Sequence, residues 1–238
     1  MTVIPEIIKL ANSKLESASA KNNNAEKRIS VAIMGGTFDP IHNGHLRTAV
    51  DIVDRFHFTQ LRLVPCFKPV HKSHPSISAK QRLDMVSLAV QSHPNLLVDE
   101  REIQRTGPSY TIDTLIELRN ELGPDVSITM VVGMDSFISL PRWHQWQRIL
   151  NYAHILVVSR PGWHPEFGIE LQELVEKSRA QSTAELQSAP AGKIHMETLT
   201  ALGISSSMIR SLCEHNKSIA YLLPESVHAY IDQHTLYQ

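Results

Sequence analysis

The chain has 238 residues, of which 42% are hydrophobic and 20% are charged. This composition is typical of a globular protein, and the length suffices for one sizeable α/β domain or at most two small ones. The formal net charge is −1, so no overall basic field would gather nucleic acid, and an anionic ligand would need local cations and backbone amides. We find no run of about 20 apolar residues and no signal-peptide pattern. Two cysteines form no disulfide framework, which favours the cytoplasm, and we expect no nucleic-acid or membrane partner.

The N-terminal residues 1–28 differ from the rest of the chain. Residues 5–15 have the spacing of an amphipathic helix, whereas residues 17–28 are small, polar and without periodicity. Such a composition is typical of a disordered linker. We therefore expect residues 1–28 to form an extension and residues 29–238 to form the folded domain.

A glycine turn between a strand and a helix is predicted within residues 31–48. Residues 31–33 are apolar, as expected of a strand buried on both faces. Gly35 and Gly36 end this run and permit a close approach of backbone that a side chain would prevent. Apolar residues then recur at helical spacing from Asn43 onward. Because a helix N-terminus presents free amides and a positive dipole end, this turn is a predicted phosphate site.

His42 and His45 lie at the mouth of this predicted helix. Three residues apart, they can point the same way and donate hydrogen bonds to one polyphosphate. The alternative is that one histidine caps the helix and the other lies on the surface. A metal site is less favoured, because Cys66 and Cys213 do not cluster with the histidines at ligand spacing, and we predict no metal held by the protein itself.

A second predicted helix begins with three serines, Ser205 to Ser207, and places Arg210 one turn after Ser206 on the same side. Serines commonly cap helices, so plain capping is the alternative explanation. Combined with the histidine pair, however, the segment indicates a second contact to phosphate.

These two segments carry a family resemblance. Residues 35–46, GGTFDPIHNGHL, resemble the first signature of the nucleotidylyltransferase superfamily, with its H-x-G-H element, and residues 204–210, ISSSMIR, resemble the second. More narrowly, the chain is similar from about Ile29 onward to bacterial nicotinate-nucleotide adenylyltransferases. The resemblance implies that His42, His45 and Arg210 are catalytic. It also implies an ATP site made of Gly35, Gly36, Thr37, Phe38, His42, His45, Gly133, Asp135, Arg160, Ser205, Ser206 and Arg210.

The resemblance further implies a site for nicotinate mononucleotide, made of Thr37, Phe38, Lys72, Tyr110, Thr111, Trp143 and His144. Amides at the helix start near Thr111 could hold a pyridine carboxylate, and Trp143 matches the aromatic residue that stacks on the pyridine ring in the family. Lys72 belongs to a proline-rich basic loop, for which simple solvent exposure is the alternative.

Some residues of the predicted binding segments could instead have a structural role, as helix caps or in core packing. Ser109 or Thr111 can cap the helix whose apolar stripe begins at Ile112 and which Gly123 and Pro124 end, and Asp135 can cap the segment after the strand at residues 126–132. Trp146, three residues after Trp143, is predicted to be packing.

Strands and helices alternate along the whole domain. Strands are predicted near residues 31–33, 61–65, 96–98, 126–132, 154–159 and 193–199, with helices between most of them and a loop at 182–192. This order predicts an α/β fold with a doubly wound, Rossmann-like parallel sheet in a single domain. Ligands then bind at the carboxyl ends of the strands, where the motifs fall.

The activity implied by the resemblance is transfer of AMP from ATP to nicotinate mononucleotide, giving deamido-NAD and pyrophosphate with Mg²⁺ carried by ATP. An enzyme that prefers nicotinamide mononucleotide or another acceptor of the superfamily is one alternative. A regulator that binds ATP without turnover is an alternative of a different class. The sequence is compatible with a monomer or a homo-oligomer.

Overall fold

A computed structural model describes residues 28–69, 75–105, 107–160, 162 and 165–238. The predicted N-terminal helix and linker lie outside these ranges, as does Lys72. The boundary between an extension at 1–28 and a domain at 29–238 therefore stays a prediction.

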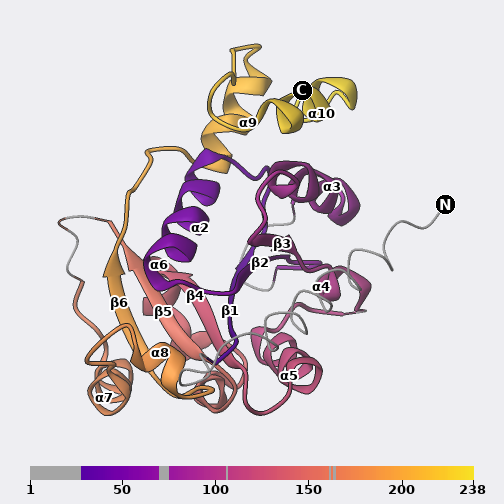
Figure 1. The fold of residues 1–238 in the computed structure, drawn as a ribbon. Coiled ribbons are helices and arrows are strands. Elements are labelled where there is room, and N and C mark those ends of the chain that lie inside the picture. The colour runs from indigo at the N-terminus through magenta and orange to yellow at the C-terminus, as the bar shows by residue number, and fades with distance from the viewer. Residues whose placement is uncertain (1–27, 70–74, 106, 161, 163–164) are drawn as a thin grey trace.

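The centre of the molecule is a six-stranded sheet in which every pairing is parallel (Figure 1). The strand order is β3-β2-β1-β4-β5-β6, so the predicted doubly wound parallel sheet is confirmed. The strands are β1 (Ser30–Gly36), β2 (Gln60–Pro65), β3 (Leu96–Val98), β4 (Ser127–Gly133), β5 (His154–Ser159) and β6 (Ile194–Thr198).

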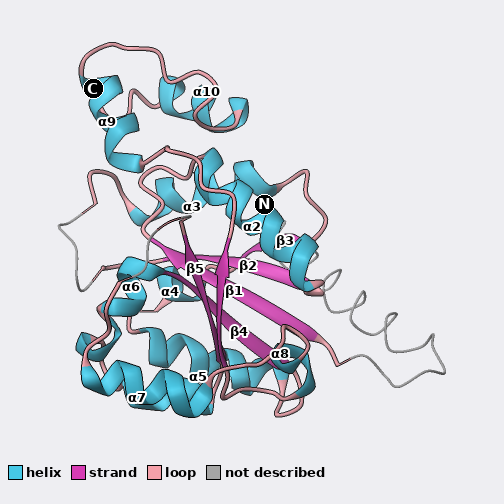
Figure 2. Cartoon of the chain, turned by 90° about the vertical axis from the view of Figure 1, so that its left-hand side faces the viewer, coloured by secondary structure: helices cyan, strands magenta, loops and turns pink. Residues whose placement is uncertain are grey.

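Helices cover both faces of this sheet. The helices α2 and α3 lie on one face, and α5 and α7 lie on the other (Figure 2). The described helices are α2 (Asn43–Phe56), α3 (Ala79–Val90), α4 (Arg101–Gln104), α5 (Thr111–Leu122), α6 (Met134–Ile138), α7 (Ile169–Ser178), α8 (Glu185–Ser188), α9 (Ser206–Glu214) and α10 (Glu225–Gln233), with 3₁₀ helices η1 (Leu140–Arg142) and η2 (Trp146–Asn151). No helix in the described part of the chain is long and apolar enough to cross a membrane.

Strand β1 is buried on both faces, as its apolar sequence predicts. Val31 and Ile33 belong to the core beneath α5, whereas Ala32 and Met34 belong to the core beneath α2. This alternation follows from the two-residue period of a strand. Because β1 pairs with both β2 and β4, its position is fixed by neighbours on all sides.

Three local predictions differ from the structure. The three-residue spacing of Trp143 and Trp146 is typical of an α-helix, but Trp143 is the C-cap of the 3₁₀ helix η1 and Trp146 begins the 3₁₀ helix η2. Residues 99–105, DEREIQR, are predicted as the exit of an edge strand, but helix α4 forms there, and the Asp99 carboxylate accepts a hydrogen bond from the Arg101 amide at its start. Within the predicted loop at 182–192, α8 forms one short helical turn because Leu186 is buried in the core.

The order in which strands are added to the sheet reverses between β1 and β4. From β1 the chain adds β2 and then β3 on one side, and it returns to place β4 on the other side of β1. In doubly wound sheets such a switch point leaves a crevice at the carboxyl ends of the two strands, and ligands bind there. We therefore expect a ligand to bind at the segments that follow Gly36 and Gly133.

Candidate functional site

The turn after β1 requires its second glycine. A Cβ atom on Gly36 would lie 2.8 Å from Cζ of Phe38, so only glycine permits this packing. The Phe38 residue as a whole is 2% exposed and packs in the core. Thr37, beside it, is only partly buried, so of these two predicted contacts Thr37 is the more accessible to a ligand.

The two histidines of the H-x-G-H segment lie against one another. The ring centroids of His42 and His45 are 3.7 Å apart with an interplanar angle of 25°. A Cβ atom on Gly44 would lie 3.0 Å from the His42 ring, which explains the glycine between them. His42 occupies the N-cap position of α2 but makes no side-chain capping bond, so the alternative that this histidine caps the helix is wrong.

Burial keeps His42 uncharged. The His42 residue is 5% exposed, and the resulting loss of solvation lowers the pKa of its imidazole from 6.5 to about 4. Its Nδ1 atom is buried and has no hydrogen-bond partner among the described residues. A contact from His42 to a ligand must therefore use Nε2.

The start of α2 is partly occupied by the protein itself. The Asn43 amide donates to the Leu222 carbonyl at 2.9 Å, and the Asn43 side chain donates to the Tyr221 carbonyl at 2.8 Å. One of the amides expected to face phosphate is thus already used, which gives the two histidine rings a larger share of any contact to an anion.

Helix α9 docks directly on the turn after β1 (Figure 1). The Ser206 hydroxyl donates to the Pro40 carbonyl at 2.9 Å, and Arg210 Nη1 donates to the Asp39 carbonyl at 2.7 Å. Ser205 caps α9 by accepting from the Met208 amide, as predicted. The two motifs, far apart in sequence, therefore form one surface.

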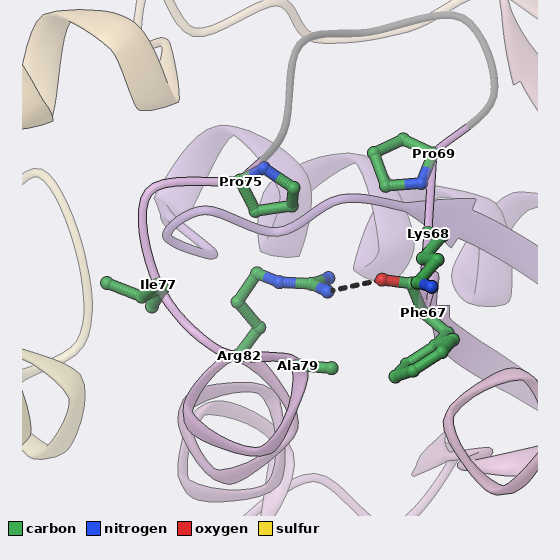
Figure 3. A pocket seen from close by; sticks show the side chains of 7 residues that line it. All are labelled: Phe67, Lys68, Pro69, Pro75, Ile77, Ala79 and Arg82. Carbon is green, nitrogen blue, oxygen red and sulfur yellow. Dashed lines mark hydrogen bonds between the residues drawn. The ribbon is translucent and has the colours of Figure 1, made fainter.

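A buried arginine joins the ends of β1 and β2. Arg82 on α3 is 1% exposed; its Nη1 donates to the Thr37 carbonyl at 2.7 Å and its Nη2 to the Phe67 carbonyl at 3.2 Å. Figure 3 shows its guanidinium directed at Phe67 among the side chains that line a pocket. The volume of this pocket is about 170 Å³. Arg82 is not among the site residues predicted from the sequence. The available signal was a charged residue three positions before the buried Met85.

Ser109 does not cap α5, and neither does Thr111. The N-cap of α5 is Tyr110, without a side-chain bond, so the predicted capping is wrong. The Ser109 hydroxyl instead accepts from the Phe67 amide at 3.0 Å and donates to the buried Glu102 carboxyl, whose pKa is raised by burial. The start of α5 is thereby attached to the end of β2.

The residues predicted for the pyridine end lie on two neighbouring segments. The ring centroids of Tyr110 and His144 are 4.5 Å apart, and Trp143, the residue before His144, is partly buried. Thr111 is the first residue of α5. Trp146 is 9% exposed and packs in the core, which confirms its predicted role.

The remaining predicted ATP contacts lie after β4 and β5. Gly133 is the N-cap of α6, and Asp135 lies in the first turn of that helix. The alternative that Asp135 serves as the cap is therefore wrong, and its side chain is exposed. Arg160 directly follows β5 and is also exposed. Within the described ranges, no group of three or more histidine, cysteine or acidic side chains could hold a metal ion.

The chain is similar to a known family along most of its length. Residues 33–212 match the family model described as cytidylyltransferase-like. A protein of Marinomonas sp. (strain MWYL1) named "Probable nicotinate-nucleotide adenylyltransferase" is 60% identical over 218 residues, which cover 92% of this chain and 99% of that protein. A protein of Hahella chejuensis with the same name is 47% identical over 213 residues, which cover 89% of this chain and 97% of that protein.

The chain belongs to the nicotinate-nucleotide adenylyltransferases, within the cytidylyltransferase-like family.

Solved structures show the same fold at low identity. The nicotinic acid mononucleotide adenylyltransferase of Plasmodium falciparum complexed with NaAD is 18% identical, with a TM-score of 0.65, covering 87% of this chain and 97% of that one. The same enzyme complexed with APC has a TM-score of 0.63 at 17% identity, and the match covers 88% of this chain and 98% of that one. At such identities the likeness concerns the fold alone, a Rossmann-like parallel sheet flanked by helices.

The low pKa of His42 predicts a stability change with pH. As the pH falls below about 6.5, the unfolded chain binds a proton at residue 42 before the folded chain does, so the folded state loses stability until the pH reaches about 4. Between pH 7.5 and pH 5 this loss amounts to about 2 kcal/mol. Urea unfolding of wild type and His42→Gln at both pH values measures it.

We expect the variant to lose about 2 kcal/mol less than wild type over this interval. The buried His154, whose pKa is also lowered by burial, is present in both proteins, so the difference between them isolates His42. Equal losses in the two proteins would show that His42 is not held neutral by burial.

Proposed function

We propose that this chain transfers AMP from ATP to nicotinate mononucleotide, releasing deamido-NAD and pyrophosphate. The observation that carries the proposal is the docking of Ser206 and Arg210 on the turn that leads into His42 and His45. The N-termini of α2 and α9, with the side chains of His42, His45 and Arg210, can then bind one polyphosphate at the switch point of the parallel sheet. The names of the similar proteins identify the acceptor.

The reaction we propose is a direct in-line displacement. A phosphate oxygen of the mononucleotide forms a bond to the α-phosphorus of ATP, the bond from that phosphorus to the bridging oxygen breaks, and pyrophosphate leaves with the electron pair. Such reactions depend mainly on positioning and charge stabilisation. His45 stabilises charge on the α-phosphate, and His42 and Arg210 hold the departing pyrophosphate.

The neutral state of His42 suits this role. In the free protein a neutral imidazole adds no desolvated charge to the site, and the arrival of a polyphosphate favours protonation, because a nearby negative charge raises the pKa of a histidine. His42 then holds pyrophosphate through a charged hydrogen bond, which is stronger than a neutral one.

Mg²⁺ enters this proposal as part of the substrate. The buried Asp39 carboxylate near Arg210 already accepts hydrogen bonds from Ser76 and Tyr237. Because these donors occupy its oxygens, the proposal places Mg²⁺ on the oxygens of ATP and not on Asp39. Carried by ATP, Mg²⁺ would offset the negative charge that develops on the phosphates during the reaction.

The acceptor site we propose lies between the start of α5 and the η1–η2 segment. The ring of Tyr110 beside His144, with Trp143 next in sequence, offers aromatic surface to a pyridine ring. The first amides of α5 near Thr111 favour a carboxylate over a neutral carboxamide, because they form a positive dipole end. Gly133, Asp135 and Arg160 remain proposed contacts to the adenosine half, and Lys72 remains a proposed contact to the mononucleotide.

The acceptor is tested by measuring pyrophosphate release with Mg-ATP and one of three acceptors. We expect clear release with nicotinate mononucleotide and much less with nicotinamide mononucleotide or phosphopantetheine, because only the nicotinate form carries the carboxylate. Preference for the nicotinamide form would contradict the proposed carboxylate contact while keeping the chemistry. ATP binding without release with any acceptor would favour a non-catalytic regulator.

The role of His45 is tested by His45→Ala. Removal of one donor to the transition state lowers turnover by about 10²–10³, as for other preorganised donors, and we expect kcat to fall by that factor. His228→Ala is the control, since this histidine lies on α10 and faces Asp232. A kcat for His45→Ala within a few-fold of that control would show that His45 does not act on the reacting phosphate.

A further inference from the structure

The segment after α10 reaches the centre of the candidate site. The Tyr237 hydroxyl donates a 2.9 Å hydrogen bond to Oδ1 of Asp39, 198 residues earlier in the chain. Figure 1 shows α9 and α10 together above α2 and α3, so this contact connects the C-terminal helices to the turn after β1.

Asp39 is a buried carboxylate with three hydrogen bonds. Its side chain is 7% exposed. Oδ1 accepts from Tyr237, and Oδ2 accepts from the Ser76 amide at 3.0 Å and from the Ser76 hydroxyl at 2.9 Å. A buried charge that accepts several hydrogen bonds needs no close ion pair to be tolerated.

Arg210 lies close to this carboxylate without forming a close pair. Its Nη1 is 2.7 Å from the Asp39 carbonyl oxygen and 4.0 Å from Asp39 Oδ2, and its side chain is 32% exposed. The guanidinium is therefore held by a backbone carbonyl and retains access to solvent. A cation in this state can contact an incoming phosphate.

We propose that Tyr237 is a positioning residue for Arg210: its hydroxyl satisfies the Asp39 carboxylate and so leaves the Arg210 guanidinium available to the polyphosphate. Without that hydroxyl, Oδ1 is left unsatisfied in a buried site, which is unfavourable. The nearby guanidinium of Arg210 is then drawn into a full ion pair with Asp39. That pair competes with the triphosphate for the same cation.

Burial and the Asp39 charge both raise the pKa of Tyr237 far above its usual range. The phenol thus remains a donor at every pH at which the protein is assayed. The inference rests on the proposed function only in naming ATP as the ligand of Arg210.

The test is equilibrium binding of Mg-ATP to the full chain and to Tyr237→Phe. We expect the dissociation constant for ATP to rise about tenfold in the variant, as the loss of one hydrogen bond to a charged group implies. In steady-state assays the KM for ATP should rise while the KM for nicotinate mononucleotide stays within twofold.

Tyr230→Phe is the matched control. Tyr230 on α10 also donates its hydroxyl to a carboxylate, Asp84 on α3, at 3.1 Å. This variant removes the same kind of bond from the C-terminal region, directed at α3 instead of the turn after β1, and it touches neither Asp39 nor Arg210. We expect its ATP affinity to match wild type. Equal ATP affinities for Tyr237→Phe and Tyr230→Phe would overturn the proposal.

A double-mutant cycle tests whether Tyr237 acts through Arg210. In an Arg210→Ala background, Tyr237→Phe should not weaken ATP binding further, because the competing guanidinium is gone. The same tenfold loss in both backgrounds would contradict the proposal.

Ser76→Ala provides a second variant that leaves the C-terminal segment intact, and it applies even if Tyr237→Phe does not fold. It removes another donor to Asp39, so we expect ATP binding to weaken about threefold; an unchanged affinity would contradict the proposal. If wild type binds ATP but transfers AMP to no acceptor, the proposed function fails while these binding comparisons still decide the role of Tyr237.

Discussion

The docking of α9 on the turn after β1 is the constraint on which the candidate site depends. Two side chains of α9, Ser206 and Arg210, donate to consecutive backbone carbonyls at residues 40 and 39. Strand β1 is itself fixed between β2 and β4 in the middle of the sheet. The position of Arg210 relative to the histidines is therefore set by the rigid part of the fold, and such preorganisation is what charge stabilisation in a reaction requires.

Buried polar groups extend this rigidity to the neighbouring segments. Arg82 connects the ends of β1 and β2, and Ser109 connects the end of β2 to the start of α5. A buried donor or acceptor that loses its partner costs about 1–3 kcal/mol, so each of these contacts favours a single arrangement of the segments. These contacts connect the turn after β1, where we propose the ATP site, through the end of β2 to the start of α5, where we propose the mononucleotide site.

The sequence predicted the parts of the structure that depend on local pattern. The apolar run at residues 31–33, the Ser205 cap and the packing of Trp146 all follow from periodicity and capping chemistry, and the structure confirms them. Long-range polar contacts have no local pattern. Nothing within a few residues of Ser109 indicates that it bonds to Phe67, or that Asp39 meets Tyr237, so local capping rules assigned Ser109 incorrectly.

A structure of the chain with a non-hydrolysable ATP analogue tests the central claim most directly. The two docked motifs predict that the triphosphate lies between the histidine pair and Arg210, with phosphate oxygens within about 3 Å of the Nε2 atom of His45 and of the Arg210 guanidinium. A triphosphate bound elsewhere, with His42 and His45 free of contacts to it, would contradict the claim that these two motifs form one phosphate site.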